Sequence, residues 1–153
     1  AALSRDGLAA QFSTNDWDQI MDVNLRGNFI LTRELIMPMI KDKWGRIIHL
    51  SSVAGLRGMP GTLAYSTAKT GLLGMSRVIA REYARFGITS NVLALGYFDI
   101  GLIETLSEKV KNRIIEEIPS RKLGNSSNVF NAIEFIMKSE YTNGSVLNID
   151  GGI

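Results

Sequence analysis

The sequence has no cysteine and only one histidine, His49, among its 153 residues. Without cysteine the chain can build neither a disulfide framework nor a thiolate metal site, and one histidine excludes a multi-histidine metal centre. We therefore expect no bound metal. Charge is nearly balanced, with 17 Lys and Arg against 15 Asp and Glu, and the basic residues are scattered. This distribution gives no basic patch for nucleic acid, which we exclude as a partner.

A long hydrophobic run is also missing. The most apolar segment, NFILTRELIMPMI (28–40), is interrupted by Arg33 and Glu34, so it does not predict a membrane span. Nothing near the N-terminus resembles a signal peptide, and we expect a soluble, cytoplasmic protein. The 45% hydrophobic content is enough to bury a core in a chain of this length. We expect residues 1–153 to form a single domain.

Short apolar segments alternate with helical ones along the chain. Runs rich in β-branched residues predict strands over three ranges: 45–52, 88–95 and 144–152. Apolar residues at helical spacing predict helices over three others: Ser13 or Thr14 to Ile40, 64–86, and Ser126 or Ser127 to Phe135. A loop is expected directly after the first strand. Strands joined by helical crossovers pair in parallel, with helices on the sheet faces, so we predict an α/β fold.

Ligands of such sheets bind beyond the carboxyl ends of the strands. Ser52 ends the first predicted strand, Gly96 ends the second, and Tyr65 opens the helix between them. All three residues should therefore meet at one edge of the sheet. Lys69 follows Tyr65 by one helical turn, which puts both side chains on the same helix face. The pair is either a solvated helix start or a proton donor with a cation that adjusts its pKa.

Three further polar residues need an interpretation. Asn24 lies on the inward face of an apolar helical stripe, where an amide without hydrogen-bond partners costs about 1–3 kcal/mol. It is either a hydrogen-bonded core residue at a helix kink or part of a site. We interpret His49, within a strand, as a hydrogen-bonded structural histidine. Ser51 should point to the sheet face opposite Ser52.

Taken together, Asn24, Ser52, Tyr65 and Lys69 resemble the Asn-Ser-Tyr-Lys tetrad of the short-chain dehydrogenase/reductases. The sequence segments around and beyond these residues are similar to the family over the whole chain: VNLRGNF, GRIIHLSSVAG, AYSTAKTGLLGMSRVIARE, GITSNVLALG and LNIDGG. The sequence is most similar to the 3-oxoacyl-[acyl-carrier-protein] reductases and acetoacetyl-CoA reductases. The resemblance implies a Rossmann-like doubly wound parallel sheet, present here as its C-terminal part of about three strands with flanking helices. The glycine-rich nucleotide-binding half of the family lies outside this sequence.

The resemblance implies an NAD(P)-dependent reductase of 3-oxoacyl thioesters. Tyr65 would donate a proton to the substrate oxygen, and Ser52 would bind that oxygen as it gains negative charge. Lys69 would lower the pKa of Tyr65. Asn24 would hold a water molecule in a proton relay behind Lys69.

The resemblance also implies where the cofactor binds, with NADP favoured over NAD. Tyr65 and Lys69 would contact the nucleotide, Lys69 at its ribose hydroxyls. Gly96 and the backbone of Phe98 would meet the nicotinamide. Leu95 departs from the family, which usually has proline at that position, and this change should loosen the nicotinamide pocket.

The implied partners are a carrier-bound or small-molecule acyl substrate and other copies of the chain. Lys43 keeps one of two basic positions that would dock an acidic acyl carrier protein, whereas Phe86 replaces the other. The family commonly forms homotetramers on its two long helices. The alternative is a non-catalytic or truncated member that builds oligomers, in which Leu95 and Ile100, where the family commonly has threonine, are early signs of decay.

Overall fold

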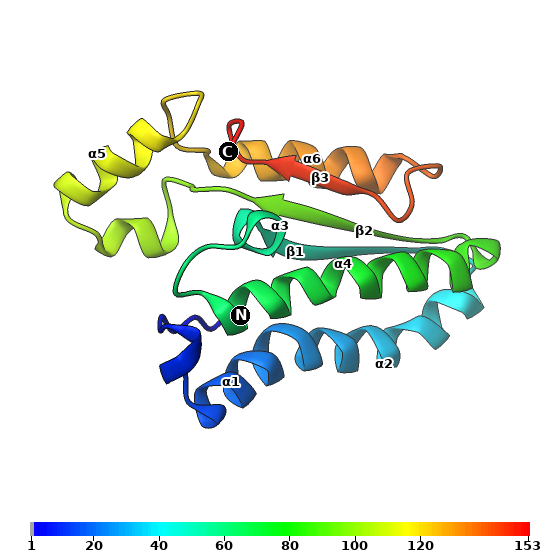
Figure 1. Cartoon of the computed structure of the whole chain (residues 1–153). Coiled ribbons are helices and arrows are strands. Elements are labelled where there is room, and N and C mark those ends of the chain that lie inside the picture. The colour runs from blue at the N-terminus through cyan, green and yellow to red at the C-terminus, as the bar shows by residue number, and fades with distance from the viewer. Residues whose placement is uncertain (1) are drawn as a thin grey trace.

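The computed structural model describes residues 2–153 (Figure 1). The helices are α1 (Thr14–Met21), α2 (Gly27–Asp42), α3 (Val53–Arg57), α4 (Leu63–Tyr83), α5 (Glu108–Glu117) and α6 (Ser126–Lys138). The strands are β1 (Gly45–Ser52), β2 (Ile88–Leu95) and β3 (Val146–Ile149). A π-helical turn, Asp22–Arg26, joins α1 to α2, and short 3₁₀ turns cover Ala9–Gln11, Ala84–Phe86 and Gly101–Thr105.

Within residues 2–153, the strands form one sheet in the order β1-β2-β3, and both neighbouring pairs are parallel. Ser52 lies opposite Leu95, and Leu95 lies opposite Ile149, so all three strands end at the same edge. This arrangement confirms the predicted α/β fold with a parallel sheet. The predicted ranges of β1 and β2 match the structure, whereas β3 is shorter than expected.

Helices cover both faces of the sheet, as Figure 1 shows for α4 and α2 on one side and α6 on the other. On the α2 and α4 face, Ile36 and Ile79 pack with Ile47 and Ile88 of the strands. On the other face, Leu93 packs with Ala132 and Ile136 of α6. The alternation of side chains along each strand supplies both cores, because successive residues point to opposite faces.

The helix boundaries follow local hydrogen bonds, and some differ from the sequence prediction. Ser13 caps α1 as expected, since its side-chain oxygen accepts from the Asp16 N–H at 3.0 Å. The cap of α6 is Asn125 rather than Ser126 or Ser127, because Asn125 exchanges two hydrogen bonds with Asn128 in a capping box. The helix expected from residue 13 or 14 to residue 40 is interrupted by the π-helical turn. The loop expected after β1 contains α3.

His49 is buried in β1, with 3% of its surface exposed. Its Nε2 atom has no hydrogen-bond partner among the described residues. The interpretation of His49 as a hydrogen-bonded histidine is therefore wrong for this nitrogen. Burial alone lowers the pKa of the imidazole from 6.5 to about 4, because the charged form would lose its hydration.

We predict that acid destabilises the fold through His49. The unfolded state takes up a proton at this residue near pH 6.5 and the folded state only near pH 4, so stability falls as the pH drops through this window. The full effect is about 3 kcal/mol in the free energy of unfolding. Urea unfolding at several pH values should show a smaller acid-induced loss for His49→Asn than for the wild type. Equal losses in the two proteins would contradict the prediction.

Candidate active site

Ser52 ends β1 and begins α3, so it lies at the carboxyl edge of the sheet. Its Oγ accepts a hydrogen bond from the Ala54 N–H at 3.2 Å and thereby caps the short helix. Because the cap uses an acceptor site, the hydroxyl proton remains available for donation. The Ser52 side chain lies close enough to the Tyr65 phenol to act on its pKa, which it lowers. The structure thus brings together the serine and the tyrosine that the sequence placed at this edge.

Tyr65 sits in the first turn of α4, and its phenol is largely buried. Burial raises the pKa of Tyr65 above its usual value, and the Ser52 side chain only partly offsets this. The net shift of the Tyr65 pKa is therefore upward rather than downward as the sequence predicted, and the lowering effect of Lys69 stays a prediction. The Lys69 ammonium lies over the tyrosine ring, 5.6 Å from its centre. The phenol is therefore protonated at neutral pH, the form required of a general acid.

Lys69 is an almost fully buried cation, with 6% of its surface exposed. Its Nζ donates a hydrogen bond to the Leu50 carbonyl oxygen at 2.8 Å, and burial lowers its pKa. Ser51 points to the opposite face from Ser52, as predicted, and its hydroxyl holds the Lys69 carbonyl oxygen at 3.0 Å. Helix α3 packs closely here, because a Cβ atom on Gly55 would lie 2.9 Å from the Lys69 Cβ.

Asn24 is fully buried in the π-helical turn. Its Oδ1 accepts from the Leu3 N–H at 3.1 Å, and its Nδ2 donates to the carbonyl oxygens of Leu3 and Ile20 at 2.6 and 3.0 Å. These bonds occupy both donors of the amide, so the interpretation as a hydrogen-bonded residue at a helix irregularity is confirmed. The main-chain carbonyl oxygen of Asn24 accepts from Asn28 Nδ2 at 2.9 Å. A relay role for Asn24 remains a prediction.

Gly96 and Phe98 lie in the loop that follows β2. A Cβ atom on Gly96 would lie 2.7 Å from the Asp150 Cα, so only glycine fits where the loop passes the end of β3. Phe98 forms a parallel bridge with Gly124, through hydrogen bonds made by the neighbouring residues on either side of Phe98. Packing therefore accounts for Gly96, and the nicotinamide contacts of both residues remain predictions.

Sequence reasoning missed three residues that shape this site. Leu50 supplies the carbonyl that holds Lys69, Gly55 permits the close approach of α3, and Asn28 binds the Asn24 carbonyl. Of the three, only Gly55 could have been recognised in the sequence, as a glycine three residues after the end of the strand that carries Ser52. Backbone partners and helix irregularities leave no periodic pattern.

Residues 2–153 hold no group of three His, Cys, Asp or Glu side chains that could bind a metal ion. No helix in the described part of the chain is long and apolar enough to cross a membrane.

Comparisons with known proteins identify the family. A family model described as Enoyl-(Acyl carrier protein) reductase matches residues 1–153. Nodulation protein G of Rhizobium sp. (strain N33) is 37% identical over 155 residues, covering 100% of this chain and 63% of that protein. The 3-oxoacyl-[acyl-carrier-protein] reductase of Aquifex aeolicus (strain VF5) is 36% identical and covers 100% of this chain and 62% of its own length. The chain belongs to the short-chain dehydrogenase/reductase family.

A solved structure shares the fold. The crystal structure described as a 2-deoxy-D-gluconate 3-dehydrogenase from Agrobacterium tumefaciens, with bound NADP, superposes with a TM-score of 0.92 at 31% identity. It covers 99% of this chain, and the chain covers 64% of it. The chain therefore spans less than two thirds of the length of the relatives that it matches.

The two adjacent serines provide a matched test of the site. We predict that Ser52→Ala raises the pKa of Tyr65 further and lowers reductase activity about 100-fold, because it removes the donor to the substrate oxygen. Ser51→Ala should lose about 1 kcal/mol of stability but keep most of its activity. Steady-state kinetics and thermal unfolding of both variants measure these effects. Equal activity losses in the two variants would show that Ser52 has no special role.

Proposed function

We propose that this chain carries the catalytic residues of an NAD(P)-dependent reductase that converts a 3-oxoacyl thioester to its 3-hydroxyacyl form. The observation that supports this most is the grouping of the Ser52 hydroxyl, the protonated Tyr65 phenol and the buried Lys69 ammonium at the carboxyl edge of the sheet. A ketone reduction needs a proton donor, a donor that binds the oxygen, and a cation close to both.

In the proposed reaction the substrate carbonyl oxygen lies against Ser52 and Tyr65. A bound NADPH or NADH would supply the hydride to the carbonyl carbon. Ser52 stabilises the charge that develops on oxygen, and the Tyr65 O–H transfers its proton there. The Lys69 cation then stabilises the phenolate that Tyr65 becomes. In the relay that we propose, the proton is returned to Tyr65 from solvent through Lys69 and a water molecule that Asn24 would hold.

The residues present fit a nicotinamide nucleotide. Within residues 2–153 the Lys69 ammonium has one polar partner, a backbone carbonyl, so the group keeps donors for ribose hydroxyls. The loop after Gly96 lies at the same edge, where nucleotides bind in doubly wound sheets. The proposal of NADP rests on the family, which uses NAD(P), and on the similar structure solved with NADP.

A thioester substrate is supported by the 3-oxoacyl-[acyl-carrier-protein] reductases among the relatives. Docking of an acidic carrier at Lys43 is constrained by the fold. Lys43 precedes β1, whereas Ser52 ends it, so the two lie on the order of 23 Å apart along the strand. In a homo-oligomer a carrier bound at Lys43 would more readily serve the site of a neighbouring copy.

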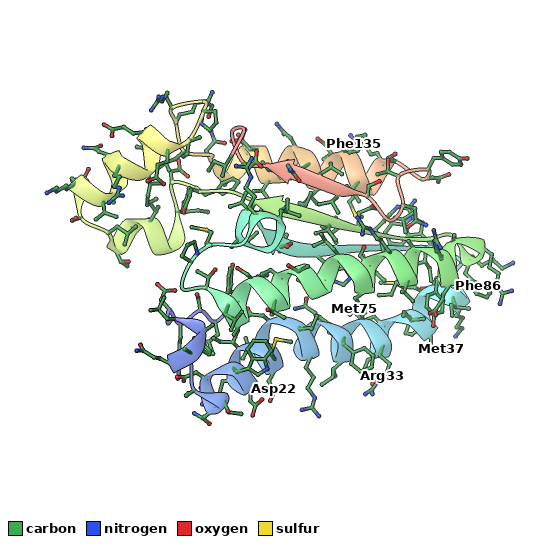
Figure 2. The ribbon with its side chains drawn as sticks, in the orientation of Figure 1. Asp22, Arg33, Met37, Met75, Phe86 and Phe135 are labelled. Carbon is green, nitrogen blue, oxygen red and sulfur yellow. The ribbon has the colours of Figure 1, made fainter. Side chains whose placement is uncertain are left out.

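We also propose that copies of this chain associate through α2 and α4. Large apolar side chains are exposed along these helices: Phe29, Ile30, Leu31, Leu35, Met37 and Val78. Met37 lies on α2 and is 68% exposed (Figure 2). Exposed apolar side chains gathered on these two helices favour an interaction site here. A tetramer built on the two long helices would cover it. The alternative, a non-catalytic member that only builds oligomers, would use the same surface.

We predict that Tyr65→Phe abolishes reduction of acetoacetyl-CoA by the whole protein while leaving its thermal unfolding unchanged. The substitution removes the proton donor and keeps the ring that packs over Lys69. Activity should fall more than about tenfold, equivalent to 1.4 kcal/mol of transition-state stabilisation. Consumption of NADPH and of NADH, followed by absorbance, measures it. Wild-type protein that reduces no 3-oxoacyl thioester while forming tetramers would favour the non-catalytic alternative.

A further inference from the structure

The segment Leu3–Gly7, here called the strap, belongs to no helix or strand. It is hydrogen-bonded to three parts of the structure: the π-helical turn, α1 and the residues just before α4. Its first anchor is Leu3, whose N–H and C=O both bind the Asn24 side chain. Because the Asn24 side-chain amide both accepts a hydrogen bond from Leu3 and donates one to it, the pair fixes the distance and the orientation of the strap against the π-helical turn. The fully buried Asn24 side chain thus serves the strap.

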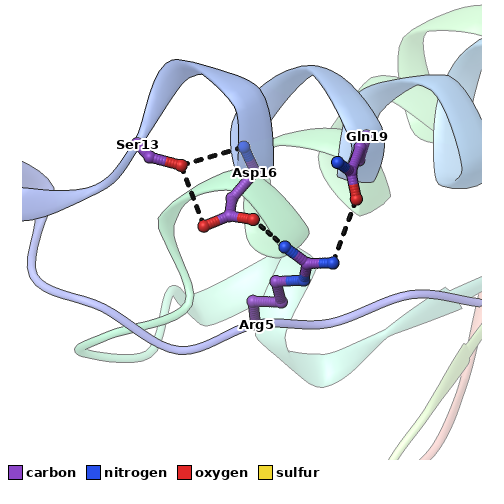
Figure 3. A network of polar contacts seen from close by, with 4 residues as sticks. All are labelled: Arg5, Ser13, Asp16 and Gln19. Atoms are coloured by element: carbon purple, nitrogen blue, oxygen red, sulfur yellow. Dashed lines mark hydrogen bonds and ion pairs between the residues drawn. The ribbon is translucent and has the colours of Figure 1, made fainter.

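The second anchor is Arg5, which reaches α1 (Figure 3). One guanidinium nitrogen of Arg5 donates to the Asp16 carboxylate, and another donates to Gln19 Oε1 at 3.0 Å. Asp16 is itself held, because its other carboxylate oxygen accepts from the Ser13 hydroxyl at 2.8 Å. Two parallel donors on a rigid fork set the direction of the side chain as well as its position.

The third anchor is Gly7, which contacts the residues just before α4. The Gly7 N–H donates to the Gly61 carbonyl oxygen at 2.9 Å, and Gly7 forms a parallel bridge with Thr62, the cap position of α4. Tyr65 lies in the turn that follows. The strap therefore joins the turn that holds Asn24 to the loop that delivers Tyr65.

We propose that the strap sets the position of Asn24 relative to Tyr65, and that Arg5 is the positioning residue that fixes the strap. The inference rests on the proposed function, because it assigns a catalytic consequence to this geometry. Arg5 touches neither Tyr65 nor Lys69 in any contact that the structure provides, so it acts only through the strap. Without Arg5 the strap keeps its two end anchors and loses its middle one, so Asn24 and the start of α4 can move independently.

The test compares Arg5→Met with Arg5→Lys, Gln19→Met and a control, Lys138→Met, in the whole protein. Lys138 is exposed on α6 and pairs with Glu134, so its removal makes the same charge change away from the strap and from the proposed association surface. Amide hydrogen exchange at Leu3 and Gly7 reports on the anchors. The dependence of kcat on pH reports on the relay.

For Arg5→Met we expect exchange at both amides to rise about tenfold and kcat to fall about tenfold, with a displaced pH profile. Arg5→Lys should recover most of the loss, because its ammonium still reaches Asp16. Gln19→Met removes only the hydrogen bond between Arg5 and Gln19, so it should give a smaller change of the same kind. This variant still tests the proposal if Arg5→Met fails to fold. Lys138→Met should resemble the wild type.

Two results would overturn the proposal. Faster exchange with an unchanged kcat and pH profile would make the strap a purely structural tie. Unchanged exchange in Arg5→Met and Gln19→Met would show that Arg5 does not fix it. A wild-type protein without reductase activity would instead contradict the proposed function, and hydrogen exchange would still decide whether Arg5 fixes the strap.

Discussion

A buried ammonium group, that of Lys69, is the constraint on which the site depends. Transfer of a cation from water into a fold is costly unless it finds partners, and the partners of Lys69 are a backbone carbonyl and the face of an aromatic ring. The surrounding structure is arranged to hold it there. Ser51 binds the Lys69 backbone, and the missing side chain of Gly55 lets α3 close over the helix. An apolar residue would satisfy a purely structural role more cheaply, which favours a chemical role for the cation.

One departure from the family, Leu95, has a structural explanation that differs from decay. Leu95 lies in the ladder between Ser52 and Ile149 and packs with the α6 core, where a proline would lack the backbone donor of a central strand. The leucine therefore extends β2 to the edge of the site. Gly96 remains where only glycine fits. Ile100 is exposed, and nothing in the structure explains it.

The sequence predicted the elements that periodicity and residue type determine, namely the ranges of β1 and β2, the start of α4 near Tyr65, and the edge shared by Ser52 and Tyr65. It did not predict the π-helical turn at Asn24, because one irregular turn leaves the apolar stripe almost unchanged. The five-residue helix α3 is too short to show a period. The predicted direction of the Tyr65 pKa shift was wrong. Residue spacing shows that a cation is near the phenol, but it does not show how much hydration the phenol loses on burial. The missing partner of His49 depends in the same way on tertiary packing.

The most direct test of this account is a pH–rate series with a titration of NADP on wild type and Lys69→Met, in the whole protein. Lys138, exposed and paired with Glu134, provides the control Lys138→Met. If the buried ammonium stabilises the Tyr65 phenolate and binds ribose, Lys69→Met should lose both activity and NADP affinity. The basic limb of the oxidation reaction should move to higher pH, as the pKa of Tyr65 rises further. Activity, NADP affinity and pH profile all matching those of Lys138→Met would contradict the central role assigned to Lys69.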